Sequence, residues 1–166
     1  MFKGAKLIVT VAVGIVAVIG LLTVVTGREK TLEIIFGPMD LTAVDFASLQ
    51  LGGKSNQFLV CPDGYCAATA HMVSPVFDGS AEDLKQRWTA MLAKQPRIEA
   101  GAADEGALQY DYIQRSETVR YPDSITVRFI PLEENKATLA IFSRSHYGHS
   151  DFGVNEKRVR AWLAGL

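Results

Sequence analysis

Residues 137–166 have the sequence ATLAIFSRSHYGHSDFGVNEKRVRAWLAGL, in which an apolar run, a polar glycine-containing loop and a helical pattern follow one another directly. Leu139 and Ile141 alternate with their neighbours, which is typical of a strand. After the loop, Asn155 is a good N-cap, and apolar residues then recur at helical spacing at Val159, Trp162, Leu163 and Leu166. The end of the chain is therefore predicted to be a strand that returns through a polar loop into a helix.

The preceding sequence supplies the other elements of one α+β domain. Residues 80–94 predict a helix, because Ser80 resembles an N-cap and an apolar stripe follows it at Leu84, Trp88, Met91 and Leu92. Alternation predicts strands over 108–112, 125–129 and 139–142, with a weaker one over 97–102. Short connections favour antiparallel hairpins. We therefore predict an antiparallel sheet of three to four strands with two helices on one face.

The N-terminal segment is apolar enough to span a membrane. Residues 7–26 contain no charged side chain, and twenty residues at about 1.5 Å each cover roughly the 30 Å of a bilayer core. A secretory signal peptide is the alternative, with Val25-Thr26-Gly27 as a weak cleavage site. Its apolar region is typically only about 7–15 residues long, so the length favours one uncleaved transmembrane helix.

This reading divides the chain into four parts. Residues 1–6 are predicted to form a cytoplasmic tip, 7–27 a transmembrane helix, 28–55 a neck packed on the domain, and 56–166 an exported α+β domain. Lys3 and Lys6 precede the span, which slightly favours a cytoplasmic N-terminus. We therefore expect a single-pass protein of the bacterial inner membrane that contacts the lipid bilayer through residues 7–26, with its C-terminal domain outside the cytoplasm.

The charge balance argues against nucleic acid as a partner. The 166-residue chain has a formal net charge of −1. Without Lys3 and Lys6, 15 basic residues face 18 acidic ones. No basic run occurs, whereas a surface that binds phosphate backbones needs clustered Lys and Arg.

The only two cysteines are Cys61 and Cys66, separated by Pro-Asp-Gly-Tyr. Proline and Asp-Gly favour a turn that brings the two sulfurs together. In an oxidising compartment, a structural disulfide is the expected result. A redox pair more typically has the spacing Cys-x-x-Cys, and a zinc site needs two further ligands, of which His71 is one candidate.

The loop over 143–155 is the candidate site. It holds an arginine at the strand end, several hydroxyl groups and the start of a helix, which together suit a carboxylate or phosphate. The predicted ligand-binding residues are Arg144, Ser145, Tyr147, Ser150, Asp151, Asn155 and Arg158. In the alternative, structural interpretation, Arg144 pairs with Asp151, and Ser150, Asp151 and Asn155 cap the helix.

The same loop contains His146, His149 and Asp151, a pattern that also fits three metal ligands with an open fourth position. Nothing in the sequence specifies that geometry, and no hydrolase elbow, zinc-protease, P-loop or dinucleotide motif occurs. We therefore predict no catalytic residue, no metal site and no cofactor.

Several stretches resemble a domain-of-unknown-function family, number 1499, over about residues 56–166. They are Ser143-Arg144-Ser145, Tyr147-Gly148, Ser150–Asn155, Arg158 with Trp162-Leu163, the pair Cys61-Pro62 and Cys66, and Tyr121-Pro122-Asp123. The family usually has arginine where this chain has His146, so the resemblance implies a pH-dependent substitute for a cation there. It implies an extracytoplasmic or membrane setting and no catalytic role.

The leading functional hypothesis is a membrane-anchored extracytoplasmic domain that binds a polar or anionic ligand, an envelope component or a membrane-protein partner. An enzyme acting on an anionic envelope substrate is the alternative, with Arg144 holding the anion and His149 or Asp151 as acid or base. A third hypothesis is an accessory subunit of a membrane protein complex.

Overall fold

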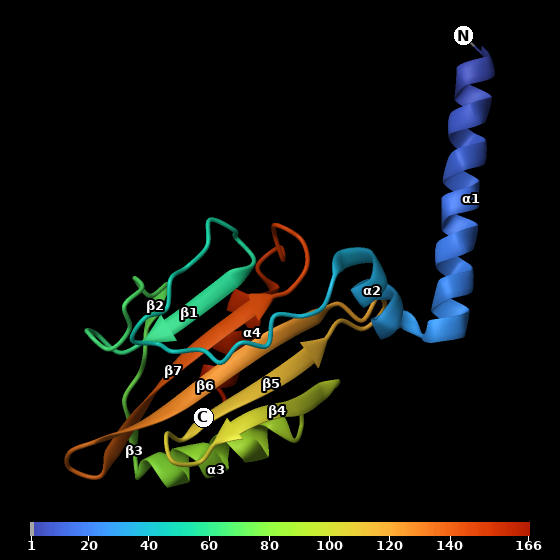
Figure 1. Cartoon of the computed structure of the whole chain (residues 1–166). Coiled ribbons are helices and arrows are strands. Elements are labelled where there is room, and N and C mark those ends of the chain that lie inside the picture. Colours follow the sequence, from blue (N-terminus) through green and yellow to red (C-terminus); the bar gives the residue numbers. More distant parts are fainter. Residues whose placement is uncertain (1) are drawn as a thin grey trace.

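The computed structural model describes residues 2–166 and begins with two consecutive helices. Helix α1 covers Phe2–Thr26 and α2 covers Arg28–Phe36, and Gly27 separates them with a φ of 84° (Figure 1). Within α1, an 18-residue window of Ala5–Thr26 has a mean hydropathy of 2.9, and no residue of that window is buried. The chain thus has one N-terminal apolar helix that is long enough to be a membrane anchor or a signal sequence.

The domain is built on a seven-stranded sheet with the order β2-β1-β7-β6-β5-β4, in which β3 also pairs with β7. The strands are β1 Gln57–Cys61, β2 Met72–Val73, β3 Phe77–Asp78, β4 Ile98–Asp104, β5 Gln109–Arg115, β6 Pro122–Leu132 and β7 Lys136–Ser145. Strands β4 to β7 form consecutive antiparallel pairs, and β1 lies antiparallel to β7. Strand β2 lies parallel to β1.

The sheet is therefore larger than the three to four strands predicted. It is also partly parallel, whereas a wholly antiparallel sheet was predicted. The additional strands come from residues 57–78, within which only a turn between Cys61 and Cys66 was predicted. Strand β1 shows no apolar–polar alternation, because Phe58 and Val60 pack on one face of the sheet while Leu59 and Cys61 pack on the other. A strand buried on both faces has a continuous apolar run, which periodicity alone does not identify.

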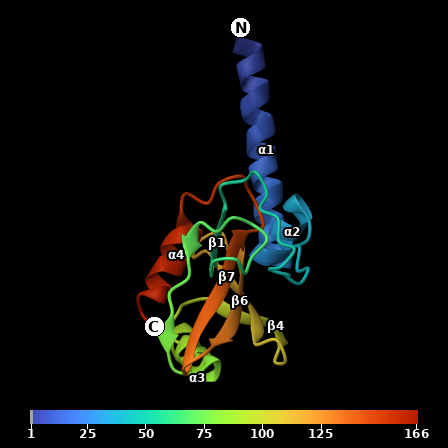
Figure 2. The ribbon, with the colours of Figure 1, turned by 90° about the vertical axis from the view of Figure 1, so that its left-hand side faces the viewer.

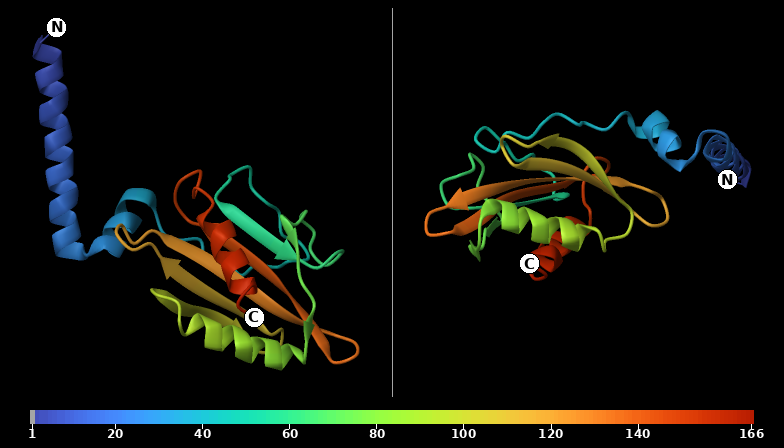
Figure 3. Two further views of the ribbon diagram at one scale, coloured as in Figure 1. Left: turned by 180° about the vertical axis from the view of Figure 1, so that it is seen from behind. Right: turned by 90° about the horizontal axis from the view of Figure 1, so that it is seen from below.

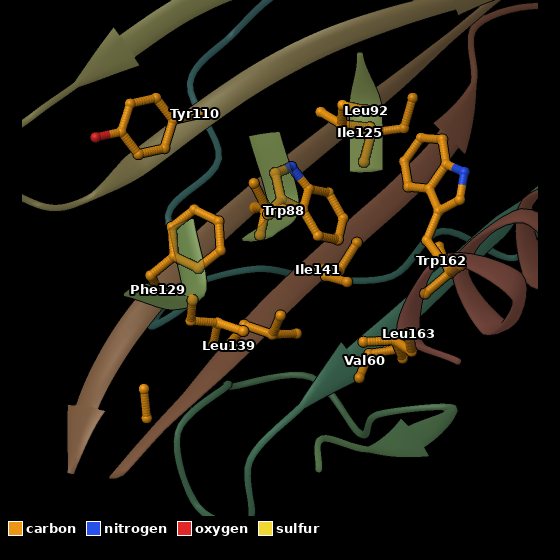
Figure 4. Close-up of a cluster of buried hydrophobic side chains, with 14 of the residues drawn as sticks. Val60, Trp88, Leu92, Tyr110, Ile125, Phe129, Leu139, Ile141, Trp162 and Leu163 are labelled. Carbon is orange, nitrogen blue, oxygen red and sulfur yellow. The ribbon is translucent and has the colours of Figure 1, made fainter. Parts of the chain in front are cut away.

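Two helices cover one face of the sheet, as predicted. Helix α3 covers Ala81–Leu92 and α4 covers Val154–Leu163. The Ser80 hydroxyl accepts the N–H of Asp83, and the Asp83 carboxylate accepts the N–H of Ser80, so a capping box begins α3. The main core lies beneath these helices, where Trp88 packs edge-on against Trp162 and Phe129 (Figure 4).

The opposite face is covered by residues 37–56, which we call the strap. Figure 3 shows the strap running along the sheet on the side away from α3 and α4. Val44 and Phe46 of the strap are buried against Leu59, Ala140 and Phe142. The Gln109 amide donates to the Val44 carbonyl at 2.8 Å, which ties the strap to β5.

The disulfide between Cys61 and Cys66 lies on the strap face, with Cα atoms 6.2 Å apart. The loop that it closes contacts the strap, because the N–H of Ala67 donates to the Phe46 carbonyl at 3.0 Å. The division of the chain at residues 6, 27 and 55 remains a prediction.

Candidate functional site

The predicted site residues lie on both faces of the sheet. On β7, alternate side chains point to opposite faces, so Ser143 points toward α4 and Arg144 toward the strap. The Arg144 guanidinium donates to the Asp40 carbonyl at 3.1 Å and lies 3.8 Å from the Asp40 carboxylate. It also stacks on Phe142. Arg144 therefore contacts the strap and not Asp151, the partner that the structural interpretation gave it.

Arg158 occupies the helix face, where its guanidinium donates to several side chains. It donates to Asp123 at 2.6 Å, to the Gln114 amide oxygen at 2.6 Å and to the Asn155 amide oxygen at 2.7 Å. Only 9% of the Arg158 side chain and 11% of the Asp123 side chain are exposed. Because Gln114 and Asp123 belong to β5 and β6, these contacts join α4 to the sheet.

Asn155 and Asn56 connect the loop to the start of β1. Asn155 is 1% exposed and donates to the Asn56 carbonyl at 3.2 Å and to the Ser145 hydroxyl at 3.1 Å. Asn56 is 3% exposed and donates to the carbonyls of Ser145 and Gly148. The two amides thus hold the returning loop against the sheet. The sequence analysis missed Asn56, which lies 99 residues before Asn155 and carries no local signal.

Asp151 acts as a cap for α4. Its carboxylate accepts the N–H of Gly153 at 3.0 Å and both the N–H and the side-chain amide of Asn155 at 2.7 Å. Burial alone would raise the pKa of Asp151, but these donors outweigh it and lower the pKa below its ordinary value. The carboxylate is therefore ionised near neutral pH.

A cavity of about 320 Å³ opens beside the loop, at the end of the sheet next to α2. We call it the end cavity. Its apolar lining is formed by Phe36, Tyr121, Pro122, Tyr147, Phe152 and Val154, and its polar lining by Ser116, Asp123, Ser145, Gly148, Ser150 and Asp151. Four of the seven predicted residues line it: Ser145, Tyr147, Ser150 and Asp151.

Three aromatic rings form one side of the end cavity. The Phe36 ring centroid lies 5.2 Å from that of Tyr147 and 6.3 Å from that of Tyr121. The Tyr147 hydroxyl donates to the Gly37 carbonyl at 2.8 Å, which fixes the ring against the start of the strap. Phe36 and Tyr121 were missed as site residues, because single aromatic residues in separate segments give no pattern that links them.

The charged side chains that line the end cavity are both carboxylates, Asp123 and Asp151. Asp123 accepts Arg158 through Oδ2, and no described residue donates to its Oδ1. The two predicted arginines do not line the cavity, since Arg144 faces the strap and Arg158 lies behind Asp123. The cavity therefore offers hydrogen-bond acceptors and apolar rings to a ligand.

The histidines of the loop are separated. The His146 imidazole hydrogen-bonds the Ser124 hydroxyl on the strap face, and burial, aided by the nearby Arg144 charge, lowers its pKa. His146 is therefore neutral at pH 7. His149 is exposed. Among residues 2–166, no group of three or more His, Cys, Asp or Glu side chains is placed to hold a metal ion.

A family model described as "Protein of unknown function (DUF1499)" matches residues 46–166. The chain belongs to the DUF1499 family. The match begins ten residues before the resemblance that the sequence indicated, so it includes Phe46 and the strap residues that follow. No match was found among curated proteins or among solved structures.

The match places the end cavity partly outside the DUF1499 region. Asp123, Tyr147 and Asp151 lie within residues 46–166, whereas Phe36 comes from α2, before the match begins. One wall of the cavity is therefore supplied by the segment that follows the apolar helix.

Proposed function

We propose that this chain is a single-pass protein of the bacterial inner membrane whose C-terminal domain lies outside the cytoplasm and binds a small polar ligand in the end cavity. Helix α1 supports the anchor, because residues 7–26 carry no charged side chain and twenty residues suffice to cross a bilayer. The disulfide supports an oxidising compartment.

The lining of the end cavity carries the proposal about the ligand. Its charged groups are carboxylates, and aromatic rings complete its lining. Carboxylates accept hydrogen bonds from hydroxyl and ammonium groups and repel anions. We therefore propose a ligand with a hydroxylated or amino-bearing ring, such as a sugar unit of the cell envelope. A volume of about 320 Å³ is at the lower end for small-molecule sites.

This arrangement gives less support to an enzyme that acts on an anion. That hypothesis needs Arg144 beside His149 and Asp151. Arg144 instead contacts Asp40, and Asp151 caps α4 by accepting three N–H groups of Gly153 and Asn155.

A charge series on one sugar ring tests the proposal. The full chain in detergent micelles is titrated with glucosamine, N-acetylglucosamine and glucosamine 6-phosphate, and binding is measured by thermal shift and calorimetry. We expect the cationic and neutral sugars to bind at least tenfold more tightly than the phosphate. Tyr121→Ala should weaken binding, whereas Leu132→Ala, at the far end of β6, should not. Tightest binding of the phosphate, or equal binding by both variants, would contradict the proposal.

A reporter fusion tests the topology separately. Alkaline phosphatase fused after Leu166 is active only outside the cytoplasm, so the proposed orientation predicts an active fusion.

A further inference from the structure

Phe152 is the most exposed large apolar side chain in the described structure, with 91% of its surface accessible. Its backbone has a φ of 56°, a left-handed conformation that suits glycine, asparagine and aspartate and is unfavourable for a bulky residue. The ring therefore gains almost nothing from packing within the domain, while its backbone is strained. A strained and exposed aromatic residue points to a role outside the domain.

The loop presents Phe152 in a fixed position. The N–H of Phe152 donates to the Ser150 hydroxyl at 3.2 Å, and the next N–H, that of Gly153, donates to Asp151 at 3.0 Å. Asn56 holds the base of the same loop. The part of the loop that carries Phe152 is thus held in place by hydrogen bonds to buried side chains.

Phe152 belongs to a larger group of exposed apolar residues at one end of the molecule. Outside α1, eleven large apolar side chains are exposed among the described residues, and six of them gather here. These six, which we call the apolar band, are Ile35, Phe36, Val119, Tyr121, Phe152 and Val154. Phe36 and Tyr121 line both the end cavity and a second cavity. Ile19 and Thr23 of α1 also line that second cavity, so the band continues onto the apolar helix.

The apolar band lies on the side of the domain toward which α1 extends. Figures 1 and 2 both show the loop between β7 and α4 on that side. Helix α2 is attached to the sheet, because Glu29 pairs with Arg120 at 2.8 Å and with Arg115 at 3.3 Å. Arg28 also donates to the Thr118 carbonyl at 2.8 Å. The segment after α1 is therefore fixed to the sheet beside the band.

We propose that the apolar band seats the domain on the bilayer that α1 spans, with the Phe152 ring at the boundary between acyl chains and head groups. This proposal depends on α1 being a membrane anchor. Aromatic rings are enriched at that boundary, and an exposed apolar patch continuous with a membrane helix fits lipid better than water. Lys54 is exposed and lines a surface pocket with Asp151 and Gly153, beside Phe152. Its ammonium group can reach anionic head groups.

Spin labels on the full chain test this contact. The native cysteines form a disulfide, so Phe152→Cys and Leu132→Cys each add one thiol for labelling. Leu132 is the control, because it is also an exposed apolar residue and ends β6, whose first residue, Pro122, lines the end cavity. In vesicles of phosphatidylethanolamine and phosphatidylglycerol, collision rates are measured with oxygen, which enters lipid, and with a water-soluble nickel chelate. We expect at least a threefold higher ratio of oxygen to nickel collisions at 152 than at 132.

A second variant keeps the label away from the tested residue. A label at Val119→Cys should become more accessible to nickel when Phe152→Asn is added. Asparagine adopts the left-handed backbone without strain, but its polar side chain does not insert into lipid. Vesicle flotation reports separately on α1. Equal ratios at 152 and 132 in a chain that floats would overturn the seating and leave the anchor intact. A chain that does not float would overturn both.

Discussion

The two faces of the sheet are covered in different ways. On the helix face, α3 and α4 bury a core of sixteen side chains; on the strap face, an irregular segment and a disulfide loop bury six. Two arginines from the same polar region lie on opposite faces, and their surroundings differ accordingly. Arg158 is 9% exposed and donates short hydrogen bonds to three side chains, whereas Arg144 is 25% exposed, hydrogen-bonds the strap and stacks on Phe142. In this domain, the arginine on the helix face is buried with its charge paired, whereas the arginine under the extended strap stays partly exposed to water.

The largest expected effect is on the buried arginine. Arg158→Met leaves Asp123 as an uncompensated buried carboxylate and removes a donor from Asn155, so the free energy of unfolding should fall by about 3–5 kcal/mol. The matched Arg144→Met on the strap face should cost about 0–1 kcal/mol. Urea unfolding of the full chain in micelles measures both. Similar losses in the two variants would show that the faces do not differ as described.

The disulfide should have the next largest effect, and it acts on the strap face. Cys61→Ala with Cys66→Ala removes the closure of a short loop, which should cost about 2 kcal/mol on the chain-entropy model. The double variant is compared with the native chain in oxidising and reducing buffer by urea unfolding. Reduction should destabilise the native chain and leave the double variant unchanged. A loss as large as that for Arg158→Met would mean that the strap face contributes as much as the helix face.

Phe152 lies at the end of the sheet, outside both cores, and its replacement should change stability less than the loss of Arg158 or of the disulfide. Phe152→Asn removes the cost of a left-handed bulky residue, so the free energy of unfolding should rise by up to about 1 kcal/mol. Thermal unfolding in micelles measures the change, with Val73→Asn as an exposed control in a strand. Destabilisation by Phe152→Asn would indicate that the ring packs within the domain.

The smallest effect should be the pH dependence from His146 on the strap face. Its folded pKa is lowered, so the unfolded chain binds the proton more readily. Stability should therefore be complete above about pH 6.5 and decline as the pH falls below it. His146→Gln should reduce this slope in unfolding curves taken between pH 7 and 5. An unchanged slope would assign the dependence to another group.

The sequence predicted α3 and α4 from apolar residues at helical spacing and β5 to β7 from alternation, with β4 as a weaker strand. It did not predict β1, β2 or β3. Strand β1 is buried on both faces and lacks alternation, while β2 and β3 have two residues each, too few for any period to appear. The parallel pairing of β1 with β2 depends on backbone contacts across residues 60–73, which no local pattern encodes.

The candidate site was predicted only in part. The loop over 143–155 was correctly singled out as a place where polar groups converge, and four of its predicted residues line the end cavity. The other walls come from Phe36 and Tyr121, more than twenty residues away in either case. No sequence pattern links these two residues to the loop, so only the folded structure shows that they line the same cavity.

By itself, the sequence determined the apolar helix, the cysteine pair, the main helices and the four longer strands, because composition, periodicity and turn residues act over short distances. Only the tertiary structure decided which face each side chain occupies. The strap covers the face of the sheet opposite α3 and α4. The pairing of β7 with β1 and β6 places Arg144 on that face, in contact with the strap. Asp123 comes from β6 to meet Arg158, and α2 brings Phe36 to the end cavity. The contact of Asp123 with Arg158 joins residues 35 positions apart and that of Asp40 with Arg144 joins residues 104 apart, so burial and charge neutralisation there depend on the packed fold.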